Sequence, residues 1–512
     1  MSIDTKSVRY GAFILTFANI LSQLLGFVYR MFLSRLVGPE GMGLFQLIFP
    51  FYSLSLALAS SGICVAVSKL SAEYLALGNY KSLRLLIRRA VFVFLALFSL
   101  ISLVAFLFTD TIAVSFLGDE RTRLAIFALV PCVLLTGIEN IHKNYFYGTK
   151  NVNPPALSDL AEQLIRMSAV LLLLKLLLPQ PDDRMLAIIV IGMCICEVFS
   201  SVFLRLVYQR HRKKLPKTGH SDPEMVKKIT KIALPVSVTN LMNNLLSSLI
   251  VIVIPRRLVL SGLTQSGALS EFGTLFGMTM PLLTLPSALI VGLSLVMVPK
   301  LSENMALGNY RDLRNKVSRA IMVTSFLVLP VLSVMIPLGP KLGLYLFGHE
   351  INGQYIFPLA VGTILAIYMM VFGSILNGLG KQTASAVNFL IGNAAELILT
   401  FLLTSIPTVR MYGYITGFIV STVITASLNF YRVVKVTKVK VEWLRWFVNP
   451  ALASLLCALV ARLIFVRCGD MFSDGLLLLL SLTGAAVVYL LAAAYQGISL
   501  EGVLSGRKRR KQ

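Results

Sequence analysis

Three ionisable residues lie within one otherwise apolar stretch of the sequence. Asp159, Glu162 and Arg166 are three and four residues apart, so a helix places all of them on one face. An ionisable group near the centre of a bilayer costs about 2.5–3.5 kcal/mol, which makes such residues functional candidates by default. The spacing favours a polar face that lines a water-filled cavity. A self-neutralised Glu162–Arg166 pair that joins two helices is the structural alternative.

A second polar face lies near the start of the chain. Asn19, Gln23 and Arg30 also share one face of a helix. Arg30 is the preferred candidate for binding an anionic substrate, because a guanidinium forms bidentate hydrogen bonds with phosphate. The alternative is that the Arg30 side chain reaches the membrane interface and serves as an anchor.

Other polar residues within apolar stretches are weaker candidates for a functional role. The asparagines Asn240, Asn243 and Asn244 are cavity candidates for the second half of the chain, with interhelical hydrogen bonding as the alternative. Four further acids lie within or near the apolar stretches, and for each of them taken singly a structural role is favoured over a functional one: Glu139, Glu197, Glu271 and Glu396. The six cysteines and four histidines are scattered without metal-ligand spacing, so we expect neither a metal nor another cofactor.

Composition places these residues in a membrane. Of the 512 residues, 56% are hydrophobic and only 14% are charged, against about 25% charged in an average soluble domain. Mean hydropathy is +0.81. A soluble enzyme of this composition would expose large apolar areas to water, so that class is excluded. The net charge of +24 fits lysines and arginines in cytoplasmic loops that face anionic membrane lipids, and nucleic acid is not an expected partner.

Apolar runs separated by charged or Pro/Gly-rich stretches predict about fourteen membrane-spanning helices. Their approximate limits are 10–33, 42–68, 87–108, 124–146, 156–178, 185–208, 229–254, 272–299, 317–339, 354–378, 384–406, 411–433, 446–466 and 474–496. Lysines and arginines concentrate in alternate loops, those on the side of the N-terminus, which are taken to include Lys143 and Lys150. This bias predicts a multi-pass protein of the cytoplasmic membrane with both termini in the cytoplasm.

The chain contains an internal repeat. Lys69-Leu70-Ser71 matches Lys300-Leu301-Ser302, and the sequence ALGNY at 76–80 recurs at 306–310. Pro50 and Pro281 are separated by the same number of residues as Lys69 and Lys300. A weaker match relates Gly148 and Lys150 to Gly378 and Lys381. Because six spans is an even number, the two copies run in the same direction, as in secondary transporters with parallel repeats. We therefore predict a six-helix lobe over 1–217, a second over 218–440, and two added helices with a basic tail over 441–512.

Several stretches resemble a known family. GFVYRMFLSRLVGPEGMGLFQLIFP (26–50), YFYGTKNVNPPALSDLAEQLIR (145–166), IPRRLVLSGLTQSGALSEFG (254–273) and MPLLTLPSALIVGLSLVMVPKLSE (280–303) resemble stage V sporulation protein B and related polysaccharide-export proteins. That family is part of the multidrug/oligosaccharidyl-lipid/polysaccharide exporter superfamily, with the MurJ-type lipid II flippases. The resemblance implies an all-α fold in which two lobes form a V-shaped cavity and two extra helices form a groove for a lipid tail. Two positions depart from the pattern: Gln23 and Pro281 stand where relatives often carry arginine.

The resemblance implies that the chain moves undecaprenyl-diphosphate-linked peptidoglycan precursor, or a related lipid-linked oligosaccharide, to the outer leaflet. No ATP-binding motif is present, so an ion gradient (proton or sodium) or the membrane potential is the expected energy source, with Glu162 or Asp159 as coupling acid. Two fused lobes make a monomer sufficient. The alternatives are a cation-coupled multidrug exporter of the same superfamily and, less favoured, a membrane glycosyltransferase or ligase.

Overall fold

The structure, a computed structural model, describes residues 5–177, 179–468 and 473–496. Within them the chain is helical and contains no strand. Backbone groups in hydrocarbon must be hydrogen-bonded within their own segment, and a helix achieves this for every apolar run. The chain divides into two compact units. Unit 1 runs to Val259 and includes Thr264–Gly273, and unit 2 holds Leu260–Leu263 and the chain from Thr274 onward.

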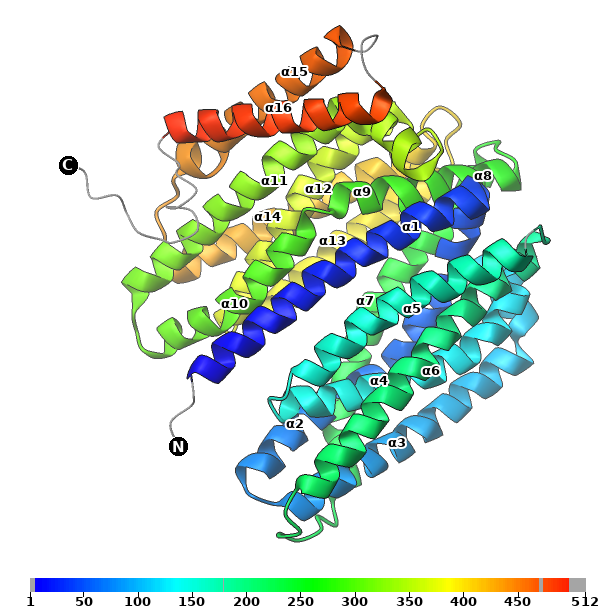
Figure 1. The fold of residues 1–512 in the computed structure, drawn as a ribbon, viewed down its shortest axis with the longest axis vertical. Helices are drawn as coiled ribbons and strands as arrows, with labels where there is room; N and C mark the ends of the chain where they lie inside the picture. Colours follow the sequence, from blue (N-terminus) through cyan, green and yellow to red (C-terminus); the bar gives the residue numbers. More distant parts are fainter. Residues whose placement is uncertain (1–4, 178, 469–472, 497–512) are drawn as a thin grey trace. The chain divides into compact units, whose positions relative to one another are not determined.

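Unit 1 contains eight α-helices and three short π- or 3₁₀-segments among its described residues (Figure 1). They are α1 (Thr5–Leu56), η1 (Ala57–Ser61), α2 (Gly62–Ala76), α3 (Tyr80–Leu107), η2 (Thr111–Leu117), η3 (Glu120–Thr122), α4 (Arg123–Gly148), α5 (Asn153–Leu177), α6 (Asp182–Lys214), α7 (Met225–Leu260) and α8 (Gln265–Gly273). Helix α1 is broken at Gly38, whose φ of 69° favours glycine, and the following Pro39 lacks an N–H for the helix to bond. Helices α4, α5 and α6 pack on one another, and α1 packs on α5.

Unit 2 is built in the same manner (Figure 1). Its elements are η4 (Thr274–Thr279), α9 (Met280–Thr284), α10 (Ser287–Ala306), α11 (Tyr310–Phe347), α12 (Gly353–Gly378), α13 (Gln382–Leu403), α14 (Met411–Thr437), η5 (Leu444–Val448), α15 (Asn449–Arg467) and α16 (Asp474–Tyr495). Helices α12, α13 and α14 pack together, while α15 and α16 pack on each other and on α11.

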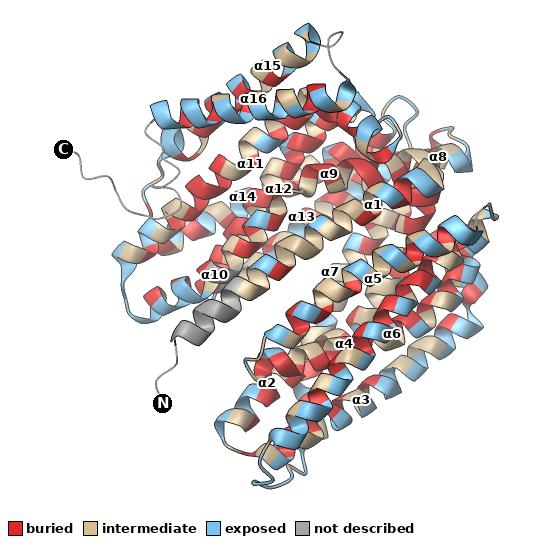
Figure 2. Ribbon diagram, in the orientation of Figure 1, coloured by how far each residue is buried: buried red, intermediate tan, exposed pale blue. Residues whose placement is uncertain are grey.

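Twelve helical segments of the described chain are long and apolar enough to cross a membrane. One of them, Ile14–Ala76, has 63 residues and contains the break at Gly38, where the sequence analysis separates two spans. Helix α5 is not among the twelve, because it carries several charged residues. The all-helical membrane fold is confirmed, whereas the number fourteen stays a prediction. Figure 2 shows many exposed residues along α3 and α16, and their exposed side chains include Phe92, Leu100 and Leu479, as expected of helices that contact lipid.

The repeated sequence forms the same helix–turn–helix in both units. Gly78 and Gly308 both adopt a φ of 66°, which favours glycine. The next residue caps the following helix in each copy: the Asn79 side chain accepts a hydrogen bond from Ser82 N, and Asn309 accepts one from Asp312 N. The weaker sequence match, of Gly148 and Lys150 with Gly378 and Lys381, also has a structural counterpart. Lys150 and Gly380 each lie just after the end of a helix, and each has a positive φ. The repeat boundary at 217/218 stays a prediction.

One copy of this turn is covered by the segment that joins α6 to α7. Ser82 Oγ donates to His220 O over 2.8 Å and accepts from Asp222 N over 2.9 Å, and Lys81 N donates to Thr218 O. The hydrogen bond from Lys228, joined by one from Tyr74, holds the pKa of Asp222 below its usual value. Asn79 is therefore buried, whereas Asn309 is exposed.

Candidate functional site

The charged face of α5 packs into a buried cluster of ionisable side chains in unit 1. Glu162 and Arg166 form an ion pair one helical turn apart, and Arg166 Nη2 also lies 3.4 Å from Glu197 Oε1 on α6. Asp159 lies nearer the start of α5 and keeps 37% of its side chain exposed. The structure thus brings together all three residues that the spacing placed on one face, and adds an acid from a neighbouring helix.

Lys143 of α4 is the hub of this cluster, and the sequence analysis missed it. Its Nζ lies 2.6 Å from Glu139 Oε1, 2.5 Å from Asp159 Oδ1 and 3.3 Å from Glu162 Oε2. The assignment of Lys143 to a loop is wrong, because the residue lies within α4 with 13% of its side chain exposed. The spacing of Glu139 and Lys143, four residues apart, was the available signal.

The cluster carries more acids than bases. The carboxylates of Glu139, Asp159, Glu162 and Glu197 face the cations Lys143 and Arg166, which leaves two formal negative charges when every group is ionised. Within the described chain, Glu197 Oε2 is buried and has no hydrogen-bond partner.

Its acids lie close together. Carboxylate oxygens of Glu139, Asp159 and Glu162 lie within 4.8 Å of one another, and a second such group joins Glu162, Cys196 and Glu197. Like charges this close in a low dielectric require compensation. Lys143 Nζ lies among the first three carboxylates, and Arg166 Nη2 contacts Glu162 and Glu197, so both groups face a cation of the chain itself.

The polar face of α1 lies beside this cluster. A Cβ on Gly26 would sit 3.9 Å from Gln163 Oε1 of α5, and Arg30 follows Gly26 by one helical turn. Asn19, Gln23 and Arg30 are all half-buried. Arg30 makes no ion pair with any residue that the structure describes. The adjacent Tyr29 is buried and lies within electrostatic range of Arg166.

The asparagines of α7 are not part of this cluster. Asn240 and Asn244 are half-buried, and Asn244 Nδ2 donates to Asn240 O over 2.8 Å within the same helix. Asn243 O likewise accepts from Ser247. The role of these asparagines stays a prediction.

Unit 2 has a polar cluster of another kind at the matching helices. Asn388 Nδ2 of α13 donates to Asn429 Oδ1 of α14 over 2.9 Å, and Thr425 Oγ1 donates to Asn388 O. When Gly148 is aligned with Gly378, Lys143 corresponds to Gly373, which faces Ser385 and Asn429. Glu396 is buried on α13 beside Ser421.

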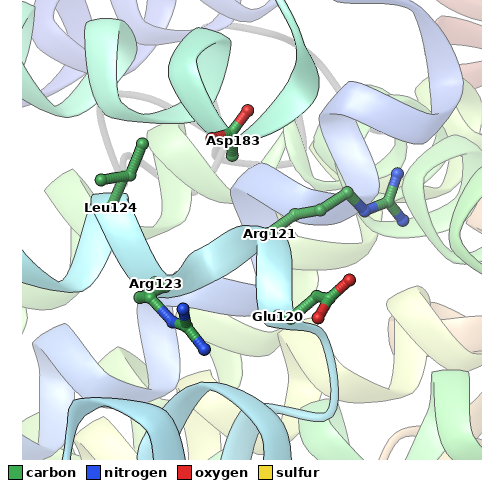
Figure 3. Close-up of a pocket in the computed structure, with 5 residues that line it drawn as sticks. All are labelled: Glu120, Arg121, Arg123, Leu124 and Asp183. Atoms are coloured by element: carbon green, nitrogen blue, oxygen red, sulfur yellow. The ribbon is translucent and has the colours of Figure 1, made fainter.

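A pocket of about 330 Å³ opens at the first turns of α4 and α6 (Figure 3). It is lined by Glu120, Arg121, Arg123, Leu124 and Asp183. The two arginines extend in different directions, Arg121 to Glu40 and Arg123 to Asp110, whose Oδ1 lies 2.7 Å from Arg123 Nε. Since both guanidiniums are ion-paired, we assign no ligand to this pocket.

Long apolar helices, an internal repeat and a charged cluster buried among them define a multi-pass membrane protein. Residues 8–305 match the family described as polysaccharide biosynthesis protein. The chain belongs to this family, which confirms the resemblance found in the sequence.

Individual proteins support the same assignment. Stage V sporulation protein B of Bacillus subtilis (strain 168) is 26% identical over 438 residues, which cover 84% of each chain. A solved structure of the lipid II flippase MurJ in an inward closed conformation has a TM-score of 0.68 at 16% identity, covering 94% of this chain and 98% of that one. An inward-facing MATE multidrug resistance transporter of the MOP superfamily also has a TM-score of 0.68 at 16% identity, covering 83% and 98%. These two structures share the fold.

Proposed function

We propose that this protein is a flippase that moves lipid II, or a related undecaprenyl-diphosphate-linked oligosaccharide, across the cytoplasmic membrane by alternating access. The product serves synthesis of the cell wall or the spore cortex. The relatives support this substrate class, since one is named as a sporulation protein and another structure as a lipid II flippase. In this proposal both termini are cytoplasmic and a monomer is sufficient.

The observation that carries the proposal is Arg30. A half-buried guanidinium in a membrane helix is costly without a partner, and no acid within the described chain pairs with it. A diphosphate has the charge and the oxygen geometry to complete its hydrogen bonds. Asn19 and Gln23 continue the polar face and suit hydroxyl and amide groups of a sugar–peptide head group.

The buried cluster supplies the coupling in this proposal. Taking up a proton or sodium ion neutralises part of its negative charge, and releasing that ion restores it. A change of charge inside a membrane shifts the balance between two conformations by several kcal/mol, so it is sufficient to drive a transport cycle. Glu162 is the proposed coupling acid because it contacts both cations of the cluster.

The substrate proposal is tested with purified protein in liposomes that contain fluorescent lipid II. An impermeant quencher reports the fraction of head groups in each leaflet over time. Wild-type protein is expected to accelerate exchange, and Arg30→Ala to slow it at least about tenfold, as the loss of charged hydrogen bonds to a buried anion predicts. Arg30→Lys keeps the charge but loses the bidentate geometry and should fall between them. Arg462→Ala, which removes an exposed arginine of α15, is the matched control.

A cation-coupled multidrug exporter is the second candidate, favoured by the match to the MATE transporter. It predicts ion-dependent efflux of organic cations from the same liposomes, with no acceleration of lipid II exchange. Equal lipid II exchange with and without the protein at every imposed gradient would exclude lipid II as the substrate. The same result with other undecaprenyl-diphosphate-linked oligosaccharides would exclude the flippase proposal and leave the exporter.

A further inference from the structure

Arg121 is the centre of an ionic hub at the end of unit 1 where α1 breaks. Its Nη1 lies 2.8 Å from Glu40 Oε1 of α1 and 2.6 Å from Asp182 Oδ2 of α6. Its Nε and Nη2 donate to the two oxygens of Asp119. Burial raises the pKa of Asp119, but hydrogen bonds from Arg121 and Gln265 outweigh burial and hold that pKa below its usual value.

Helix α8 is attached to this hub by its first residues. Ser266 Oγ donates to Glu40 Oε2 over 2.5 Å. Gln265 Nε2 donates to Asp119 Oδ2 and to Gly118 O, both over 3.2 Å. Two of the acids that hold Arg121 therefore also hold α8, so the hub and the position of α8 are not independent.

Beyond these contacts α8 packs on the backbone of α1. A Cβ on Gly43 would collide with Leu269 O, and a Cβ on Gly273 would collide with Pro39 O and Gly43 N. Two backbones approach this closely because glycine, which has no Cβ, stands at each of these contacts. Ala268 and Leu269 of α8 are fully buried.

Helix α8 is also the point where the chain leaves unit 1. Gly273 is the last residue of unit 1, and Thr274, the first residue of the π-helix η4, begins the second and longer segment of unit 2. A π-helix is rare and is often found at functional positions, since its wider turn leaves one residue without the regular bond. Because α8 packs within unit 1 and its chain continues directly into unit 2, its attachment to α1 limits how the chain can move at this point.

We propose that α8 is a releasable clasp, held against α1 through Glu40 and Asp119 in one state of the transport cycle and released in another, with η4 as its hinge. The inference rests on the proposed transport function. A close backbone contact and a few charge-assisted hydrogen bonds suit such a clasp, because both can break and re-form. Glu40 and Asp119 are positioning residues here and contact no substrate.

The first experiment measures the clasp without any substrate. In a chain whose six native cysteines are replaced, Ala268→Cys reports release, because its thiol is buried while α8 contacts α1. The rate of its reaction with a polar maleimide is measured in nanodiscs. Glu40→Gln is expected to raise this rate about tenfold, since one charge-assisted hydrogen bond is lost. Glu120→Gln is the matched control. It removes one negative charge next to Arg121 in the sequence, at a residue that does not contact α8, and it should leave the maleimide rate unchanged. Leu269→Cys repeats the measurement if the first reporter folds poorly.

The second experiment locks the clasp. Glu40→Cys and Ser266→Cys are joined by a short bis-methanethiosulfonate crosslinker, and lipid II exchange is measured before and after reduction. We expect a loss of at least about tenfold that reduction restores, with each single-cysteine variant unaffected by the reagent. Equal maleimide rates in wild type and Glu40→Gln, or full exchange in the locked chain, would overturn the clasp. Absence of exchange in the wild-type protein instead removes lipid II as the proposed substrate, and the maleimide rates still decide on the clasp.

Discussion

The α4–α5–α6 bundle of unit 1 and the α12–α13–α14 bundle of unit 2 occupy corresponding places in the duplicated sequence, yet they bury different polar groups. Unit 1 joins its helices through Lys143, Arg166 and four carboxylates. Unit 2 joins them through the amides of Asn388 and Asn429. Both arrangements join neighbouring helices, although the ionic one leaves Glu197 Oε2 without a hydrogen-bond partner among the described residues.

The difference concerns what each bundle can respond to. An amide pair keeps the same charge at any pH or ion concentration, so the contact between α13 and α14 is fixed. A cluster with more carboxylates than cations changes its charge when a proton or cation binds. The two copies therefore differ in the charge they bury: one holds the ionic cluster, and the other holds the amide pair together with Glu396 of α13.

The largest expected effect is on stability, from Lys143→Met. Removing the cation leaves Glu139 and Asp159 without their ion pairs, and an uncompensated buried charge typically costs about 3–5 kcal/mol. Thermal unfolding in nanodiscs should show a clear loss relative to wild type. The double variant Lys143→Met/Glu139→Gln should regain part of the lost stability. An unfolding midpoint of Lys143→Met equal to that of wild type would show that Lys143 does not hold the cluster together.

A smaller loss is expected in unit 2. Asn388→Leu leaves one amide of Asn429 without its partner, at a cost of about 1–3 kcal/mol. The same unfolding measurement applies, and the dependence of lipid II exchange on an imposed gradient should stay as in wild type. A loss of gradient dependence in Asn388→Leu would remove the contrast between the two bundles.

Coupling gives the third prediction. Glu162→Gln keeps the size of the side chain and removes one titratable group. The factor by which a proton or sodium gradient accelerates lipid II exchange should therefore be about tenfold smaller than in wild type. The measurement compares exchange with and without each gradient. Normal transport by Glu162→Gln at every imposed gradient would exclude Glu162 as the coupling acid.

The smallest effect concerns the repeated turn. Replacing the capping asparagine by alanine removes one hydrogen bond to a helix N-terminus, which costs about 0.5–2 kcal/mol. Asn79→Ala should lower the unfolding midpoint more than Asn309→Ala, because Asn79 also packs against Gly219 of the covering segment. Equal losses would mean that this segment adds nothing to the turn.

Local patterns in the sequence predicted the membrane fold and the internal repeat. The Glu162–Arg166 pair followed from its spacing, and ALGNY identified both copies of the repeat, whereas the turn that it forms comes from the structure. Contacts that join distant segments were not predictable in this manner. Lys143 looks like any basic residue near a helix end until α5 is packed beside α4, and the hub at Arg121 collects residues from α1, α6 and the chain before α4.

Unit 1 is not a continuous N-terminal piece of the chain, since α7 and α8 belong to it. During synthesis the first six helices enter the membrane with all members of the charged cluster already present. Glu40 and Asp119 must wait for their partners on α8 until residue 273 has left the ribosome. The first unit therefore completes its assembly only as the second begins to be made, and a truncated chain that ends after α6 should be a target for membrane proteases.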